Sequence, residues 1–410
     1  TCRSSGWTTS TTKIYYYSSR CASAGVRGLS LRAALPRQPA VVETMAELVA
    51  AAVPELLRPE QAAQHYSEAV RTAVAACAED TAGQRCYICL EAVHPDTNEG
   101  LVRGCACRGG AGFAHVSCLA RQAQVAVERD AQIGWPRWMT CRQCEQKYHG
   151  VVACALGWAC WKTYVGRPET DEIRGCAMNV LGRGLHEAEH DEDALSVQEA
   201  LLFMLRRLGV PEETILATQS NLATTYSSLG RKEEASQMYR EVYHGALGLL
   251  GEEHAHTLLT ANNYANCLFE LRRFEEAKEL LRKVTPVARR VLGEEDRLTI
   301  KMRWTYAEAL YLDPDATLDD LREAVATLED AERIARRVFG GQHPLTVDTE
   351  GGARVSRAKL RAREDAEPDV SAQELDAAEA AAAAAVAAAA IKKRQRRETI
   401  ERERSRRRTG

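Results

Sequence analysis

The chain has 410 residues, of which 45% are apolar and 27% are charged, as in soluble proteins that fold around a core in two or three domains. No apolar run reaches the roughly 18 residues of a membrane-spanning helix, so a soluble protein is expected. The net charge of −3 divides into +5 for residues 1–44, +7 for residues 392–410 and −15 between them, which argues against nucleic-acid binding by the folded core. Low aromatic content and abundant alanine favour a mainly α fold.

The first 79 residues offer few candidate functional residues. Residues 1–44 are rich in serine and threonine and contain a single acidic residue. We interpret them as a low-complexity N-terminal segment that is either a transit peptide or not translated, with the true start at Met45. The stretch MAELVAAAVPELL then opens a helical lead-in, which we place at residues 45–79.

Residues 80–150 hold eight candidate metal ligands in four close pairs. Two ligands separated by two residues can hold one metal ion from a tight turn, so each pair supplies half of a four-coordinate site. Disulfides would need an oxidising compartment, and the chain shows no clear secretory signal. The pattern therefore predicts two zinc ions as cofactors. The pairs are Cys86–Cys89, Cys105–Cys107, His115–Cys118 and Cys141–Cys144.

This cysteine-rich segment is too short to fold by burying apolar surface alone. About sixty residues with few large apolar side chains bury too little area, so bound metal is expected to supply the folding free energy. Four glycines suit a ligand loop that turns tightly around a metal ion, namely Gly104, Gly109, Gly110 and Gly112.

The sequence around the ligands resembles one zinc-finger family. The stretches RCYICLEA, GCACRGG, AHVSCL and TCRQCEQKY, within residues 86–148, resemble the RING-CH (RING-variant) zinc finger. The resemblance implies a cross-brace, in which the first and third pairs hold one zinc ion and the second and fourth pairs hold the other. The first site would use Cys86, Cys89, His115 and Cys118, and the second Cys105, Cys107, Cys141 and Cys144.

The PHD finger is the nearest alternative because it uses the same order of ligands. In PHD fingers the fourth ligand and the histidine usually lie closer together than the seven intervening residues seen here. PHD fingers also usually carry tryptophan two residues before the seventh ligand, where this chain has Met139 next to Trp138. A PHD-like reader of histone tails therefore stays open as a second interpretation.

RING-type fingers recruit a ubiquitin-conjugating enzyme, so the resemblance implies a RING-type ubiquitin–protein transferase. Closed zinc sites do no chemistry, and catalysis by positioning needs neither a catalytic residue nor a covalent intermediate. By resemblance, Ile88 and Leu90 of the first zinc loop would contact the conjugating enzyme. Trp135 or Trp138 would complete the groove. The alternatives are packing inside the finger for Ile88 and packing against the next helix for the tryptophans.

Glu145 departs from the pattern of active RING fingers, many of which place a basic residue just after the last ligand. This departure keeps a non-catalytic scaffold for protein–protein interaction open as an alternative function. The stretch VVACALGWACW follows the finger, and its eleven apolar-rich residues are too few to span a membrane. We predict a buried connecting helix within residues 151–174.

The second half of the chain repeats at a fixed period. Leu-Gly or Phe-Gly steps end at Gly209, Gly251, Gly293 and Gly340, with spacings of 42, 42 and 47 residues. Each unit has apolar residues at helical spacing and predicts two helices. The glycines suit left-handed helix ends, the arginine pairs Arg289–Arg290 and Arg336–Arg337 suit helix capping, and Pro286 is expected to kink or split its helix.

The repeats resemble tetratricopeptide repeats in the 42-residue form of kinesin light chains, and we assign them to residues 175–365. Such units stack into an α-solenoid whose concave face usually binds a peptide. Asn221 and Asn263 occupy equivalent positions, where the family uses asparagine to hold a peptide backbone. An inter-repeat hydrogen bond is the alternative role. The expected partners are therefore a ubiquitin-conjugating enzyme and a protein or peptide substrate.

Residues 366–410 combine an alanine-rich stretch, which predicts a helix, with a basic tail. The tail is either a solvated arm or a nuclear signal. Together these features predict an intracellular RING-CH ubiquitin ligase in the cytoplasm, with the nucleus as the alternative location.

Overall fold

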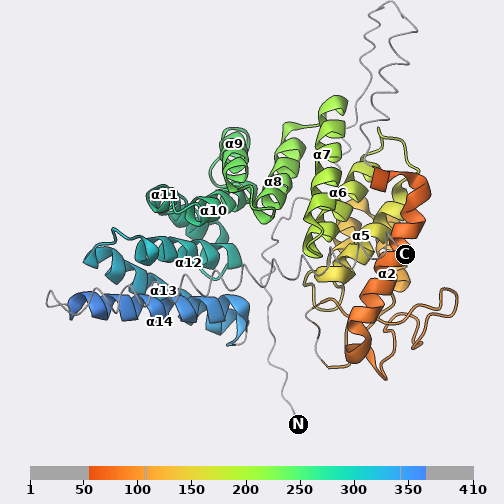
Figure 1. The fold of residues 1–410 in the computed structure, drawn as a ribbon, viewed down its shortest axis with the longest axis horizontal. Coiled ribbons are helices and arrows are strands. Elements are labelled where there is room, and N and C mark those ends of the chain that lie inside the picture. The colour runs from red at the N-terminus through yellow and green to blue at the C-terminus, as the bar shows by residue number, and fades with distance from the viewer. Residues whose placement is uncertain (1–54, 106, 108, 342, 366–410) are drawn as a thin grey trace, which may run out of the picture. The chain divides into compact units, whose positions relative to one another are not determined.

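The computed structural model describes residues 55–105, 107, 109–341 and 343–365, and the chain divides into two compact units at Leu249–Leu250 (Figure 1). We call the described residues up to 249 the N-terminal unit and those from 250 the C-terminal unit. The described residues are mainly α-helical and contain no β-strand. The predictions for residues 1–44 and 366–410 lie outside them.

The N-terminal unit begins with a one-turn 3-10 helix, η1 (Glu55–Leu57), and the long helix α2 (Pro59–Thr81). Pro59 stands in the first turn of α2, where its missing N–H costs no hydrogen bond. The buried face of α2 packs on α5 (Gly150–Tyr164), with His65 stacked 4.5 Å from Trp158 between ring centroids. The lead-in is therefore helical from Pro59 onward and joins the core of this unit.

The finger, which we define as residues 86–148, contains one full helix. Helix α3 (Val116–Arg129) follows the third ligand pair, and the short α4 (Ala131–Gly134) and the 3-10 helix η2 (Trp135–Trp138) precede the fourth pair. Isolated β-bridges join Val102 to Ala114 and Thr140 to Lys147. The finger is thus a set of loops arranged around α3.

Helix α5 is the connecting helix predicted from VVACALGWACW. Most of its side chains are buried, including Trp161 at 0% exposure, and it packs against α2, α3 and α6 (Glu172–Glu187). The close approach of α5 and α6 depends on Gly184, because a Cβ there would lie 2.6 Å from the carbonyl oxygen of Ala153. Among the described residues, no helix is both long enough and apolar enough to cross a membrane.

Helix pairs follow α5 in the N-terminal unit. They are built from α6, α7 (Asp191–Leu208), α8 (Glu212–Ser228) and α9 (Lys232–Leu250). Helices α6 and α7 pack together, and α7 packs on α8. A Cβ on Gly245 of α9 would meet the Leu216 side chain of α8 at 2.8 Å, so the leucine occupies the space beside this glycine.

The C-terminal unit consists of α10 (Ala255–Glu270), α11 (Phe274–Leu292), α12 (Arg297–Leu312), α13 (Leu318–Phe339) and α14 (Pro344–Glu364) (Figure 1). Each helix packs on the next, and α12 also contacts α10 and α14, as stacked helix pairs require. Leu281, Ile300 and Leu328 are 0% exposed in its core. The mainly α fold class, with a small finger followed by repeat helices, is confirmed.

Two details of the repeats differ from the sequence-based predictions, and a third adds to them. Helix α11 runs without a break through Pro286, so the helix is not split. The repeat glycines all have positive φ, but only Gly209 is shown in the left-handed helical region, whereas Gly293 and Gly340 have ψ near 163 and 164°. The arginine pairs lie in the last turns of α11 and α13, as predicted, and Arg337 also pairs with Glu295 at 2.7 Å, 42 residues away.

Candidate metal centre

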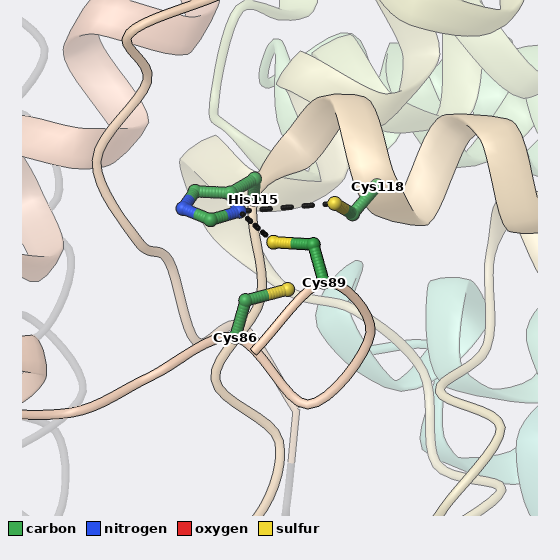
Figure 2. A group of neighbouring side chains, drawn as sticks. All are labelled: Cys86, Cys89, His115 and Cys118. Carbon is green, nitrogen blue, oxygen red and sulfur yellow. Dashed lines mark hydrogen bonds between the residues drawn. The ribbon is translucent and has the colours of Figure 1, made fainter. Parts of the chain in front are cut away.

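The first and third ligand pairs converge on one cluster (Figure 2). The ligand atoms of Cys86, Cys89, His115 and Cys118 all lie within 4.8 Å of one another. Nδ1 of His115 lies 3.3 Å from Sγ of Cys89 and 3.7 Å from Sγ of Cys118. Three sulfurs and one nitrogen at this spacing match a tetrahedral zinc site of the Cys3His type.

The His115 ring presents the correct nitrogen for a metal ion. Its Nε2 lies 3.4 Å from the carbonyl oxygen of Ala92, so the proton that makes this hydrogen bond is on Nε2 and the lone pair is on Nδ1. Burial lowers the pKa of His115 below its ordinary 6.5, which keeps the imidazole neutral at pH 7. A neutral ring held by its second nitrogen is the form that binds metal.

The second and fourth pairs form the other cluster, from Cys105, Cys107, Cys141 and Cys144. Their sulfurs also lie within 4.8 Å of one another, and Sγ of Cys107 is 3.8 Å from Sγ of Cys141. The interleaving of the four pairs is therefore the cross-brace that the resemblance implies. The two clusters could each hold a zinc ion.

The first and fourth pairs share one backbone geometry, a tight turn between the two cysteines that we call a knuckle. In each, the amide of the residue after the second cysteine donates to the carbonyl of the first cysteine, at 2.9 Å for both Leu90 to Cys86 and Glu145 to Cys141. Leu90 and Glu145 both have left-handed φ, of 68° and 56°. The amides of Ile88 and Gln143, by contrast, point at the sulfurs of Cys86 and Cys141, at 3.4 Å each.

These knuckles favour the thiolate form of two of the sulfurs. Burial raises the pKa of Cys86 and of Cys141, but backbone N–H donors outweigh burial and hold both pKa values below the ordinary 9.0. Burial instead raises the pKa of Cys107 to about 11, with neighbouring cysteines contributing. Sulfurs gathered this closely need a dication to become thiolates together, and a thiolate-preferring tetrahedral ion such as zinc fits the donor set.

Gly112 is required by the second cluster. Its φ is +83°, and a Cβ there would lie 2.6 Å from Cβ of Cys107 and 3.1 Å from Sγ of Cys105. The Gly112 amide donates to Oε1 of Gln143 at 3.1 Å, which ties the second ligand loop to the fourth pair. Sequence reasoning identified the glycine but missed Gln143, whose role depends on a contact 31 residues away.

Glu99 anchors the finger to the helices around it and was also missed. Its carboxylate accepts hydrogen bonds from the Ser117 amide at 3.0 Å and from the Tyr66 hydroxyl at 2.9 Å. The first bond places a negative charge at the N-terminus of α3, which has no side-chain cap of its own. On the other side of the finger, Arg103 binds Asp80 at 2.6 Å and the Gly109 carbonyl at 3.1 Å.

The tryptophans do not form the partner surface predicted for them. Trp135 and Trp138 are 3% and 1% exposed, and both rings pack on Tyr164 of α5. The structure therefore supports the alternative, packing against the following helix. The indoles became buried because α5 covers them, a contact that the finger sequence alone does not contain.

The other two predicted contact residues are accessible. Leu90 is 66% exposed, and the half-buried Ile88 lines a pocket of about 570 Å3 between the first zinc loop and α3. Arg137 of η2 and Arg142 of the fourth-pair knuckle line the same pocket. These arginines occupy the part of the groove that had been assigned to the tryptophans.

The two repeat asparagines, Asn221 and Asn263, differ in their hydrogen bonding. Nδ2 of Asn221 donates to Oδ1 of Asn179 at 3.0 Å, which is the inter-repeat hydrogen bond considered as its alternative role. Asn179 lies exactly one 42-residue period earlier, so the repeat spacing could have identified it. Asn263 on α10 is partly exposed and makes no hydrogen bond within the described part of the chain.

Comparison with known proteins supports both halves of this description. Residues 86–144 match the family model of the RING-variant domain, and residues 215–256 and 257–297 match the tetratricopeptide repeat. No curated protein matches the chain. Residues 86–144 are therefore a RING-variant zinc-finger domain, which favours this family over the PHD finger. In this chain the domain is followed by tetratricopeptide repeats.

Similar solved structures come from repeat proteins. A putative kinesin light chain from Podosopora anserina, with nearly identical TPR-like repeats, is 21% identical over 54% of this chain and 98% of its own, with a TM-score of 0.41. BtubC (BKLC) from P. vanneervenii is 16% identical over 62% of this chain and 93% of its own, with a TM-score of 0.38.

Proposed function

We propose that this protein is a RING-variant ubiquitin ligase, in which the finger recruits a ubiquitin-conjugating enzyme and the repeats bind the substrate. The observation that carries the proposal is the pocket beside the first cluster, lined by Ile88 of the zinc loop and by α3. Leu90 extends the apolar surface outward from the same loop. A docking surface next to a closed, four-ligand metal cluster suits recruitment better than metal chemistry.

Zinc would supply folding free energy and a fixed loop geometry, with all four positions of each site taken by the chain. Cys86, Cys89, His115 and Cys118 would hold the first ion, and the remaining four cysteines of the pattern the second. Ile88 and Leu90 would then dock the conjugating enzyme. Its thioester reacts with a lysine held nearby, so the contribution of this chain is proximity and orientation.

The substrate side of the proposal rests on the repeat helices. Asn263 offers an amide that can donate to and accept from a peptide backbone, and its side chain has no hydrogen-bond partner in the described residues. Asn179 and Asn221 already bind each other, so a peptide would have to compete with that bond. We therefore assign the peptide contact to Asn263 first and to Asn221 second.

An autoubiquitination assay tests the ligase activity. The zinc-loaded full chain is incubated with ubiquitin, activating enzyme and a panel of conjugating enzymes. Chains should form with at least one of them, and Ile88→Ala should lower the rate about tenfold while two equivalents of zinc remain bound. Val93→Ala is the matched control, because Val93 is an exposed apolar residue of the same loop outside the pocket. No activity and no binding with the whole panel would refute the proposal.

A non-catalytic scaffold is the second candidate, and Glu145 is the observation that favours it. Its side chain is exposed at the position after the last ligand, where many active RING fingers carry a cation. The two candidates differ in conjugating-enzyme binding, which a scaffold lacks. They also differ in the effect of Glu145→Arg, which should raise ubiquitin discharge in a ligase and change nothing in a scaffold.

We also propose that the protein acts in the cytoplasm. Thiolate zinc sites need reduced cysteines, and the described cysteines are free thiols. The cytoplasm meets this requirement, and the basic C-terminal tail adds the nucleus as an alternative. Imaging of the tagged full chain, with and without residues 392–410, distinguishes the two locations.

A further inference from the structure

The pocket beside the first zinc loop has an unusual composition for its size. We call the aliphatic part of its lining the floor, which includes Ile88 together with Val125 and Ala126 of α3. Four arginines and one aspartate, Asp130, make up the charged part of the lining, which we call the rim. The arginines are Arg121, Arg129, Arg137 and Arg142.

The arginines converge from three separate elements. Arg121 and Arg129 belong to α3, Arg137 to η2 and Arg142 to the knuckle of the fourth ligand pair. Their positions are distant in sequence, so a simple run of basic residues does not explain the cluster. The fold itself brings the four cations to one rim.

Most of these cations are not neutralised by the chain. Arg129, Arg137 and Arg142 make no hydrogen bond or ion pair within the described residues. Arg121 lies 3.9 Å from Glu128, with its own side chain 65% exposed. Other arginines of the same unit are paired, as Arg103 is with Asp80. Unpaired guanidinium groups around an apolar floor can bind carboxylates at low desolvation cost.

We propose that this pocket selects a conjugating enzyme whose docking loop presents an apolar side chain flanked by carboxylates. The inference rests on the proposed ligase function and deepens it by naming the charge of the partner. The apolar residue would pack on Ile88 and Val125, and the carboxylates would pair with Arg137 and Arg142. Complementary charge would set which conjugating enzymes bind and how fast.

A nucleic acid fits the same features less well. Phosphate backbones are bound by extended basic stripes, and residues 45–391, which contain this pocket, carry a net charge of −15. Among the residues that line the pocket, His94 alone has an aromatic ring, and the rest of the uncharged lining is aliphatic or polar, so stacking of successive bases has little support. An acidic protein loop therefore matches the pocket better.

The test measures conjugating-enzyme binding and ubiquitin discharge by the zinc-loaded full chain at 50 and 300 mM NaCl. The variant is Arg137→Glu with Arg142→Glu, because Arg129 lies in the last turn of α3, where a cation also stabilises the helix end. Arg71→Glu is the matched control, an exposed arginine on α2 outside the pocket. Zinc content is measured for every variant.

We expect the double variant to bind the active conjugating enzymes about tenfold more weakly at low salt, and the difference to shrink at high salt. The control should match the wild type. Wild-type affinity in the double variant, together with loss of binding in Ile88→Ala, would overturn the charge inference and leave the ligase proposal standing. Binding of a short RNA by the wild type, abolished by the double variant while conjugating-enzyme binding persists, would also overturn it.

Discussion

The finger and the C-terminal unit are stabilised in opposite ways. The finger has one helix of more than four residues, and its loops are held by eight ligands and by single polar contacts such as Glu99 to Ser117. In the C-terminal unit, five helices of 16 to 22 residues pack through aliphatic side chains such as Leu281. The finger adds two clusters of metal ligands to its share of the N-terminal core, whereas the C-terminal unit depends on apolar contacts between helices.

This difference predicts where each region fails. Loss of one ligand removes a large share of the free energy that folds the finger, because much of its backbone is irregular loop and only part of it lies in the apolar core of the N-terminal unit. Loss of one aliphatic side chain in the C-terminal unit leaves the other contacts in place. The two regions should therefore respond independently to metal removal and to core truncation, and the following variants test this independence.

Removing a metal ligand should have the largest effect. Cys118→Ser breaks the first cluster, and we expect it to unfold the finger, since structural zinc contributes on the order of 10 kcal/mol. Helices α10 to α14 should keep their protection from hydrogen exchange. Zinc analysis and hydrogen exchange on the full chain measure both effects. Cys267→Ser on α10 is the control, a buried cysteine that is not a ligand, and its zinc content should stay unchanged. Equal loss of protection in both regions would contradict independence.

Truncating the core of the C-terminal unit should have the next largest effect. Leu281 on α11 is 0% exposed, and Leu281→Ala should lower the free energy of unfolding of this unit by about 2–5 kcal/mol. Thermal and urea denaturation measure the loss, and the zinc content should not change. Val291→Ala, on the same helix but 40% exposed, should cost well under 1 kcal/mol. A change in bound zinc with Leu281→Ala would show that the regions are coupled.

The stability of the C-terminal unit should depend on pH through one buried carboxyl group. Burial, with the nearby charge of Asp348, raises the pKa of Glu308 from 4.5 to about 8. Because the folded state holds a proton that the unfolded state releases, stability should fall as pH rises from about 4.5 towards 8. We expect roughly 2 kcal/mol over this window, reduced from the full linkage because part of the side chain reaches solvent.

Glu308→Gln should flatten that pH dependence in urea denaturation of the C-terminal unit. Glu279→Gln, at an exposed position on α11, serves as the control and should leave the slope unchanged. An identical slope in wild type and Glu308→Gln would rule out this carboxyl as the source.

Two glycines of the N-terminal unit compare a crowded position in the finger with an open position at a helix end. Gly112→Ala in the finger should cost about 2 kcal/mol or more, because positive φ adds to a clash with Cys107. Gly209→Ala at the end of α7 should cost about 1 kcal/mol, since the φ of +63° is unfavourable but no atom lies within 4 Å of the new Cβ. Zinc affinity should fall only in the first variant. Equal effects of both substitutions on zinc affinity would argue against the tight packing at Gly112.

Features fixed by local spacing were predictable from the sequence. The eight ligands followed from the pair pattern, their interleaving was implied by the resemblance to the RING-CH finger, and the repeats followed from their 42-residue period. Features fixed by tertiary contact were not. The burial of Trp135 and Trp138 depends on Tyr164 of α5, and Gln143 binds a loop far away in sequence. The arginine rim was missed because its members lie on three elements that only the fold brings together.

Helix α5 bears on how the proposed ligase activity would work. It contacts α3 on one side and α6 on the other, and Gly184 lets α5 and α6 approach almost backbone to backbone. The finger is thus joined to the first helix pair by a helix that packs on both, and not by a flexible linker. A substrate bound near that pair would lie at a fixed distance from the ubiquitin carried by the conjugating enzyme. Distance and orientation would then decide which lysine is modified.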